Sequence, residues 1–303
     1  MPTLTVFTPL YNRINTLKRR TYESLKRQTC KDFIWLIVDD GSTDNPYDAI
    51  KKWLEKDNGF EIKYVYKENG GMHTAHNTAY ENIDTELNVC VDSDDYMPDN
   101  AVELIVNCWN ENKNKGYAGI IALDFADSTK KVIGKELPTY KESTTLMGYY
   151  NNGGFGDKKL IYRTDIIKAT PPYPVFDNEK YVALAYKYHL IDEKYELKIL
   201  NECVCIVDYQ MDGSSTNMYR QYVRNPKGFA FWRKEQMKHS INIKQKFKAC
   251  IHYVSSSLIA KNKHFVKESP EKFLTVLSIP IGYILKVIVM KKSKSSYMKV
   301  EGI

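Results

Sequence analysis

The sequence predicts an α/β protein with a doubly wound, mostly parallel sheet of the Rossmann-like kind. Short apolar runs at 4–7, 33–38, 62–66 and 87–91 begin about 29, 29 and 25 residues apart, a spacing that fits a strand, a helix and two loops. The segments between these runs carry apolar residues at helical spacing. Strands that alternate with helices are typical of parallel sheets, in which ligands bind at the carboxyl ends of the strands. Functional residues are therefore expected at those ends.

The remaining elements follow from the same two periodicities. Helices are expected at 13–28, 46–56 and 74–83, and another has Pro98 in its first turn and runs to Trp109. Further along, 119–125 favours a strand, 126–160 favours loops, 178–190 favours a helix, and 196–209 favours one or two strands. We place the α/β domain at 1–215 and a helical, basic C-terminal region at 216–303.

Charge is divided unevenly along the chain. The whole chain has 44 Lys and Arg against 37 Asp and Glu, a net charge of +7. Residues 220–303 hold 18 basic and four acidic residues, so this part carries +14 and residues 1–219 carry −7. A long apolar stretch, interrupted by a proline, a glycine and a lysine, ends in a lysine cluster, so 273–294 is expected to associate with an anionic membrane surface as an in-plane or re-entrant helix. A buried helix of a small subdomain is the alternative. Nucleic-acid binding is not expected, because the region lacks a compact recognition module.

Composition and cysteine spacing indicate the class and the compartment. A hydrophobic fraction of 43% with 27% charged residues excludes disordered and collagen-like chains. None of the six cysteines forms a C-x-x-C pair, so reduced, mostly buried thiols are expected rather than a disulfide or zinc framework. The first residues lack the basic segment of a secretory signal. These features predict a cytoplasmic protein.

Four strand ends carry polar motifs. They read T-P-L-Y-N-R at 8–13, V-D-D-G-S-T-D at 38–44, E-N-G-G-M-H-T-A-H-N at 68–77 and D-S-D-D at 92–95. The first contains no G-x-G-x-x-G, which disfavours a nicotinamide or flavin site. Two glycines before a helix start let phosphate approach backbone N–H groups. Asp92 and Asp94 point to the same side of an extended segment, where two carboxylates suit a divalent cation shared with a pyrophosphate. Taken singly, the motifs also fit turns, helix caps or a solvated acidic loop.

In this order and spacing, the four motifs resemble those of family 2 inverting glycosyltransferases with the GT-A fold. The nearest resemblance is to bacterial enzymes of capsule, exopolysaccharide and wall-polymer synthesis, and it covers roughly residues 3–215. It implies that Pro9 and Tyr11 line a uracil pocket, with Tyr11 stacked on the base. It also implies that Asp40 accepts the uracil N3–H and that Asp39 supports this loop.

The same resemblance implies a diphosphate and metal site. Contacts to the ribose and the diphosphate would come from Asn69, Gly70, Gly71 and His76, of which the histidine stands where many relatives place an arginine. Asp92, with Ser93 beside it, would contact the ribose or the donor sugar. Asp94 would be the direct ligand of Mn²⁺ or Mg²⁺, with Asp92 as a second metal-site carboxylate.

The catalytic base is where this chain departs from the family pattern. Relatives carry an acid at the start of a helix well downstream of the D-x-D motif. Here 176–184 reads F-D-N-E-K-Y-V-A-L, so Glu179 matches, while a later acid position holds Leu184. Glu179, or else Asp177, is predicted to take the acceptor proton, and Asp212 is the second choice for an acceptor-site acid. The structural alternatives are an acid that favours a helix N-terminus and a turn residue before a glycine.

These features predict a metal-dependent enzyme that moves a sugar from a nucleotide-sugar donor, a UDP-sugar by the resemblance, to a hydroxyl of a glycan or polyprenyl-linked acceptor. It would serve bacterial cell-surface polysaccharide synthesis as a peripheral protein at the inner face of the plasma membrane, with homo-oligomer formation left open. The alternative is a catalytically impaired subunit that binds nucleotide-sugar, which Leu184 motivates. A sugar-1-phosphate nucleotidyltransferase is disfavoured because 8–13 contains no glycine.

Overall fold

A computed structural model describes residues 1–209 and 218–300, with side chains described as far as 294. Two compact units divide the chain. Unit 1 comprises Met1–Pro172 and Lys187–Gln210, and unit 2 comprises Tyr173–Tyr186 and Met211–Ile303. The segment Tyr173–Tyr186, which lies inside the predicted α/β domain, therefore packs with the C-terminal helices. The functional boundary at 215 stays a prediction, and Asp212 lies outside the described residues.

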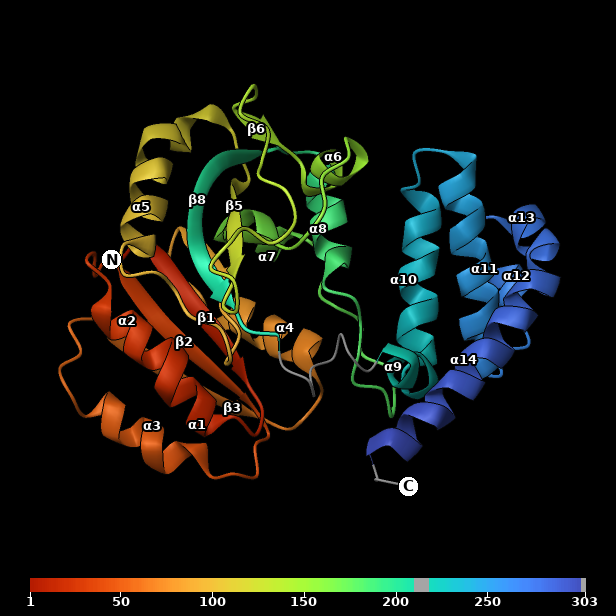
Figure 1. The fold of residues 1–303 in the computed structure, drawn as a ribbon, viewed down its shortest axis with the longest axis horizontal. Coiled ribbons are helices and arrows are strands. Elements are labelled where there is room, and N and C mark those ends of the chain that lie inside the picture. Colours follow the sequence, from red (N-terminus) through yellow and green to blue (C-terminus); the bar gives the residue numbers. More distant parts are fainter. Residues whose placement is uncertain (210–217, 301–303) are drawn as a thin grey trace. The chain divides into compact units, whose positions relative to one another are not determined.

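Unit 1 is built on one mostly parallel sheet, as the sequence predicts (Figure 1). Among the described residues its eight strands lie in the order β3-β2-β1-β4-β7-β5-β8-β6. Their bounds are β1 Leu4–Leu10, β2 Phe33–Asp40, β3 Glu61–Lys67, β4 Leu87–Cys90, β5 Gly119–Ala126, β6 Ser143–Thr144, β7 Lys158–Arg163 and β8 Leu197–Val207. The first four strands pair in parallel, and β7 runs antiparallel between β4 and β5. The strand order reverses beside β1, so the carboxyl ends of β1 and β4 form the switch point at which such sheets bind ligands.

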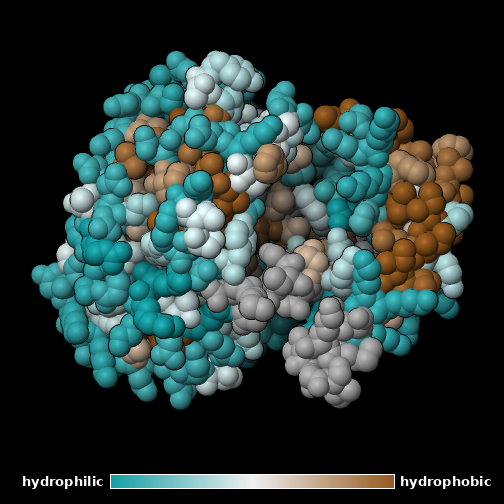
Figure 2. All heavy atoms as spheres, viewed as in Figure 1, coloured by the Kyte–Doolittle hydropathy of each residue, from teal (hydrophilic) through white to brown (hydrophobic). Residues whose placement is uncertain are grey.

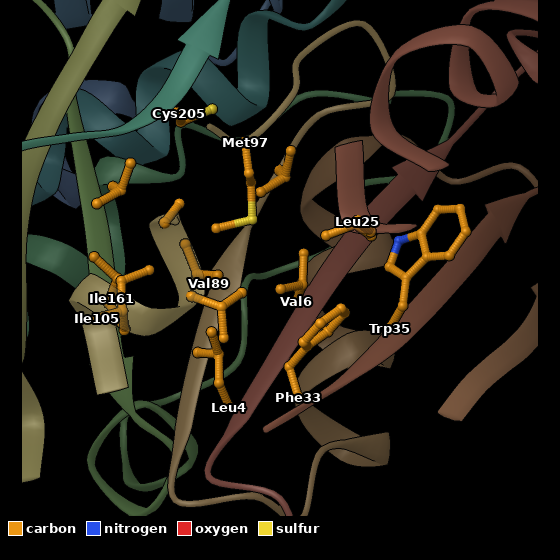
Figure 3. Close-up of a cluster of buried hydrophobic side chains, with 14 of the residues drawn as sticks. Leu4, Val6, Leu25, Phe33, Trp35, Val89, Met97, Ile105, Ile161 and Cys205 are labelled. Carbon is orange, nitrogen blue, oxygen red and sulfur yellow. The ribbon is translucent and has the colours of Figure 1, made fainter. Parts of the chain in front are cut away.

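Helices cover both faces of this sheet. They are α1 Ile14–Leu17, the π-helical η1 Lys18–Tyr22, α2 Glu23–Arg27, α3 Pro46–Leu54, α4 Met72–Asn82, α5 Ala101–Asn112, the 3₁₀-helical η2 Lys113–Lys115, α6 Leu146–Asn151, α7 Thr164–Ala169 and α8 Ala185–Asp192. On one face, Leu4 and Val6 of β1 pack in a buried cluster with Leu25 of α2 and Ile105 of α5 (Figure 3). On the other face, Phe7 meets the rings of α4 edge-on, the nearest at a centroid distance of 5.0 Å.

Three stretches differ from the sequence-based expectations. The helix expected at 13–28 contains the π-helical turn η1. The stretch 126–160, expected to be loops, contains β6, α6 and the start of β7. Two lysines at the start of β7 mask the apolar pattern by which a strand is predicted. The helix expected at 178–190 begins only at Ala185, so the chain before it is not helical.

Unit 2 is helical. In the part that the structure describes, its helices are α9 Met218–Arg224, α10 Pro226–Lys238, α11 Ile243–Ile259, α12 Phe265–Glu268, α13 Lys272–Leu277 and α14 Ile279–Val300. Met237, Cys250 and Tyr253 form a small buried core between α10 and α11. All six cysteines of the chain are free; Cys205 and Cys250 are buried and the other four are partly buried, so fewer are fully buried than the sequence predicts. None of the described helices combines the length and the hydropathy that crossing a bilayer requires.

Candidate functional site

The loops that follow β1 and β2 are tied together by hydrogen bonds. Asn12 adopts a left-handed conformation with φ of 52°, and its side-chain oxygen accepts from the N–H of Thr43 at 2.6 Å. The N–H of Ile14, which begins α1, donates to the Asp44 carboxylate at 3.1 Å. Asp44 therefore caps α1 and not the helix that follows it in the chain. The two loops form a joined rim at the carboxyl end of the sheet.

Asp40, the last residue of β2, clamps the loop 68–71. Its Oδ1 accepts from Lys67 Nζ at 2.5 Å and from the N–H of Gly70 at 2.9 Å. Its Oδ2 accepts from Asn69 Nδ2 at 3.0 Å and from the N–H of Gly71 at 2.8 Å. Four donors fill the acceptor positions of a carboxylate. The predicted acceptance of a uracil N3–H by Asp40 therefore requires one of these bonds to be replaced.

The turn after β2 is fixed by Asp39 and Gly41. Asp39 is buried and accepts from the N–H of Ser42 at 2.8 Å and from the hydroxyl of Tyr64 at 2.6 Å. Gly41 has φ of +74°, and a Cβ there would lie 2.6 Å from the backbone nitrogen of Asn69. Only glycine combines that conformation with this close approach. The packing between the turn and the loop 68–71 thus depends on residue types that the D-D-G motif supplies.

The loop 68–71 leads directly into α4. Gly71 precedes the helix with φ of 93°, and no side chain caps the helix start. The first N–H groups of a helix carry partial positive charge, which suits a phosphate group. Gly70 and Gly71 already donate their N–H groups to Asp40, so a phosphate at this position would meet the first N–H groups of α4 instead.

The D-x-D residues follow β4 in a tight turn. The N–H of Asp95 donates to the backbone oxygen of Asp92 at 3.0 Å, and Thr21 Oγ1 donates to the backbone oxygen of Asp95 at 2.9 Å. Arg13, from the loop after β1, lies 3.9 Å from Asp94 Oδ2. Burial, and next the negative charge of Asp92, raise the pKa of Asp94 above its usual value. A divalent cation between the two carboxylates would relieve this repulsion, so the donor set fits a metal.

The protein supplies only part of such a coordination sphere. Across the described ranges 1–209 and 218–300, no three side chains of His, Cys, Asp or Glu lie together as a ready-made metal site. A cation held by Asp94 and Asp92 would take its other ligands from a diphosphate and from water. That division of ligands is the usual one for Mg²⁺ at nucleotide sites.

The remaining predicted donor-site residues differ in exposure. Pro9 is buried within β1, where it lies beside Val38 of β2. Ser93 is also buried, with 6% of its surface exposed. Tyr11 is 49% exposed, so its ring is accessible for stacking at the carboxyl end of β1.

A largely buried lysine near the D-x-D turn, with 13% of its side chain exposed, was missed by sequence reasoning. Lys159 Nζ lies 3.6 Å from Asp124 Oδ1 and donates to the backbone oxygen of Cys90 at 3.4 Å. Burial opposes the lysine's charge, but Asp124 and then other acids, Asp95 among them, raise its pKa well above the usual value. Burial raises the pKa of Asp124 to about 6. No local signal marks Lys159, because it lies in the stretch 126–160, whose sequence favours loops.

Arg20 is a second residue that sequence reasoning did not single out. Its guanidinium pairs with Asp127 at 3.0 Å and with Asp208 at 2.6 Å, and the N–H of Asp208 donates to Asp95 Oδ1 at 3.1 Å. This chain of contacts links the π-helical turn to the residues after β5, β8 and the D-x-D turn. Single π-helical turns recur at functional sites. Nothing in the sequence distinguishes Arg20 from the adjacent Arg19.

His76 lies beneath the site, which corrects its predicted contact with the diphosphate. The ring is 1% exposed, with Nδ1 3.2 Å from the Tyr80 hydroxyl and Nε2 3.7 Å from Cys90 Sγ. Burial lowers the pKa of His76 to about 3. The neighbouring His73 is equally buried, and burial lowers its pKa to about 4. Both imidazoles are therefore neutral parts of the core near pH 7.

Glu179 caps a helix in unit 2. Its two carboxylate oxygens accept from the N–H groups of Lys227 at 2.9 Å and Gly228 at 2.8 Å, at the start of α10, and the residue is 8% exposed. A carboxylate in this position stabilises the helix through its macrodipole. The capping alternative therefore describes Glu179, although the helix that it caps is α10 and not its own. Asp177 is exposed, and its segment is not helical.

Comparison with known proteins identifies the family. The model of Glycosyl transferase family 2 matches residues 5–170, which is more than half of the 303 residues and includes all four strand-end motifs. Glycosyltransferase GlyA of Streptococcus pneumoniae is 36% identical over 102 residues, which are 34% of this chain and 14% of GlyA. Chondroitin synthase of Pasteurella multocida is 33% identical over 113 residues, 37% of this chain and 11% of the synthase. The matches thus span a small part of these curated relatives.

Solved structures share the fold over almost the whole chain. S. aureus TarS 1-349 in complex with UDP-GlcNAc has a TM-score of 0.61 at 15% identity and covers 99% of this chain and 92% of that one. The mannosyltransferase PcManGT from Pyrobaculum calidifontis, in complex with GDP-Man and Mn²⁺, has a TM-score of 0.54 at 15% identity and covers 94% and 87%. These likenesses confirm the predicted GT-A-like α/β fold. With the family match across its strand-end motifs, the chain belongs to glycosyl transferase family 2.

Proposed function

We propose that this protein transfers a sugar from a UDP-sugar to a hydroxyl of a glycan or polyprenyl-linked acceptor, with inversion at the anomeric carbon. The observation that carries the proposal is the position of the D-x-D turn at the switch point of the sheet, where Asp94 lies 3.9 Å from Arg13 of the loop after β1. The adjacent β2 end clamps the loop 68–71 beside it. UDP is preferred because the structural relative TarS binds UDP-GlcNAc, and the GDP-Man complex of PcManGT makes GDP the competing nucleotide.

Each part of the donor has a proposed place. Tyr11 stacks on the base, and the loop 68–71 contacts the ribose and the diphosphate beside the start of α4. Asp92 contacts the ribose or the sugar. Asp94 is the direct ligand of Mn²⁺ or Mg²⁺, which, when bound, stabilises the negative charge that develops on the departing diphosphate. Arg13, close to Asp94, orients that carboxylate.

The acceptor hydroxyl must lose its proton on the face opposite the leaving group. Glu179 is a poor choice for this role, because both of its oxygens accept helix N–H groups. Asp177 is therefore the base that we propose from the two predicted acids. A subunit that binds nucleotide-sugar without turnover is the competing function, and the helix-capping role of Glu179 together with Leu184 favours it.

The biological setting is proposed from the curated relatives. GlyA and chondroitin synthase are bacterial proteins whose names indicate glycosyl transfer and polysaccharide synthesis. We propose a role in cell-surface polysaccharide synthesis at the cytoplasmic face of the plasma membrane, where polyprenyl-linked acceptors are accessible.

Release of nucleoside diphosphate tests the proposal. The full chain is incubated with Mn²⁺ and, separately, UDP-GlcNAc, UDP-glucose and GDP-mannose, with and without glycan acceptors. We expect UDP release that falls about a hundredfold or more in Asp94→Asn, since one electrostatic contact to the transition state is worth that much. Asp99→Asn is the matched control, because Asp99 is an exposed acid of unit 1 paired with Arg27.

The outcomes separate the candidates. GDP release alone would replace the nucleotide in the proposal. Nucleotide binding without release from any donor would favour the non-catalytic subunit. Equal release by the wild type and Asp94→Asn would contradict the assigned metal site.

A further inference from the structure

The helices α13 and α14 of unit 2 turn several small and polar residues inward, beside the apolar Leu274 and Val289. Thr275 and Ser278 are fully buried, and Ser293 is 3% exposed. Gly282 is buried against α11, where a Cβ would lie 2.6 Å from the Cβ of Val254. The inner face of these helices is therefore shaped for close approach of helix backbones.

The outer face of the same helices is large and apolar. Eight of the 22 large hydrophobic side chains that are exposed in the described chain fall within the sixteen residues 273–288. These eight residues, which we call the apolar face, are Phe273, Val276, Leu277, Ile281, Tyr283, Ile284, Val287 and Ile288. Phe273, Leu277, Ile281, Ile284 and Ile288 follow one another at intervals of three or four residues, and the other three lie beside them, so the eight form one stripe. Figure 2 shows hydrophobic residues gathered over this part of unit 2.

This arrangement is the reverse of a helix on a water-soluble surface. There, large apolar side chains turn inward because burial stabilises each by about 1.5–3 kcal/mol, and serines face water. Phe273 is 75% exposed and Ile284 is 59% exposed, while Ser278 is fully buried. Small residues between helices with large apolar residues outside are the pattern of proteins whose outer solvent is lipid. Contiguous apolar patches of this kind mark interaction surfaces.

Charge decides which surface fits the apolar face. Residues 272–294 contain five lysines and no acidic residue. Lys272, Lys291, Lys292 and Lys294 are exposed, and Lys286 lies over the ring of Tyr283 at 5.7 Å. Lysines beside an in-plane apolar stripe complement anionic lipid headgroups. A protein partner matched to the stripe alone would not require this one-sided charge.

We propose that unit 2 docks on an anionic bilayer through the apolar face. Helix α13 and the first turns of α14 lie in the membrane plane, with the apolar face in the boundary between headgroups and acyl chains and the lysines at the headgroups. The inner face stays packed on α11. The docking does not depend on the donor chemistry, so it stands or falls separately from the proposed function.

Sedimentation with lipid vesicles tests this docking. The full chain is mixed with vesicles of phosphatidylcholine alone or with phosphatidylglycerol added. The test variant is Ile281→Asp with Ile284→Asp. Its matched control is Ile241→Asp with Ile243→Asp, which changes the same charge at unit 2 isoleucines that are 66% and 62% exposed outside the apolar face.

We expect the wild type and the control to bind anionic vesicles and the test variant to bind at least about tenfold more weakly. Lys291→Gln with Lys292→Gln should weaken binding to anionic vesicles by about tenfold or more, without changing the weak binding to neutral ones. Thermal unfolding followed by circular dichroism checks that each variant is folded. In Tyr283→Trp, brominated lipids should quench the new indole.

Two results would overturn the proposal. One is equal vesicle binding by the wild type and the Ile281→Asp, Ile284→Asp variant. The other is a wild type that ignores vesicles but dimerises in analytical ultracentrifugation, with dimers lost in the test variant, because a second copy would then cover the apolar face.

Discussion

Replacing Lys159 by methionine should destabilise the protein strongly, because it leaves Asp124 buried without its cation. The two side chains are 13% and 4% exposed, and Nζ lies 3.6 Å from Oδ1. At an effective dielectric constant of about 20, their attraction is about 4–5 kcal/mol. Methionine lacks the free-energy cost of desolvating the lysine charge, which offsets part of this lost attraction. We therefore expect the free energy of unfolding to fall by about 3–4 kcal/mol, as for other buried ion pairs from which one partner is removed.

Urea unfolding at pH 7 measures this loss. Lys63→Met is the matched control, because the Lys63–Glu61 pair at 4.0 Å is exposed on both sides and should contribute less than about 1 kcal/mol. Adding Asp124→Asn to Lys159→Met should restore about 1–2 kcal/mol, since no uncompensated charge then remains. A loss below about 1 kcal/mol in Lys159→Met, or a double variant less stable than the single one, would show that Asp124 does not depend on the Lys159 cation.

Three further predictions follow from the site and from unit 2. Asp40→Ala should lower the free energy of unfolding by about 3 kcal/mol or more and abolish nucleotide binding, because it leaves four donors from Lys67 and the loop 68–71 without their acceptor. Urea unfolding measures the first effect and calorimetry the second. Unchanged nucleotide binding would contradict the role of Asp40 in holding this loop. His73 has a pKa of about 4 in the folded protein and about 6.5 in the unfolded chain, so its contribution to stability is present above pH 6.5 and is lost on acidification. Between pH 7 and 4.5 the free energy of unfolding of the wild type should fall by about 2 kcal/mol more than that of His73→Gln. Equal losses would contradict the burial of His73 as a neutral ring. Glu179→Gln should lower the free energy of unfolding by about 1 kcal/mol and leave kcat within a few fold of the wild-type value, because Glu179 caps α10. A hundredfold fall in kcat would instead identify Glu179 as the base.

The parallel part of the fold could be predicted because its signals are local. The runs at 4–7, 33–38, 62–66 and 87–91 are all strands, buried except for the partly exposed edge strand β3, and the spacing between them predicts the strand–helix order. The antiparallel strand β7 could not be found this way. Its sequence K-K-L-I-Y-R begins with two lysines, and it becomes a strand because β4 and β5 pair with it on both sides.

In the candidate site, too, the residues at strand ends could be predicted from the sequence, and the contacts between distant segments could not. The motifs placed Asp40, Asn69, Asp92 and Asp94 at one edge of the sheet, because strand ends are readable from the sequence. The Asp40 clamp and the Lys159–Asp124 pair join segments far apart in the chain, so only the folded structure shows them. His76 was misplaced for a related reason. Its motif position suggested the diphosphate, but the turn of α4 directs its ring toward Phe7 and Tyr80.

We propose a donor site at the D-x-D turn that is UDP-selective and metal-dependent. The most direct test is thermal unfolding of the wild type and Asp94→Ala with UDP, GDP or CMP, each with and without Mn²⁺. At a hundredfold excess over Kd, a ligand stabilises the native state by about 2.7 kcal/mol. We predict a shift that UDP produces, that requires Mn²⁺ and that Asp94→Ala loses. Absence of a shift with every nucleotide, or an equal shift in Asp94→Ala, would contradict a donor site at the D-x-D turn.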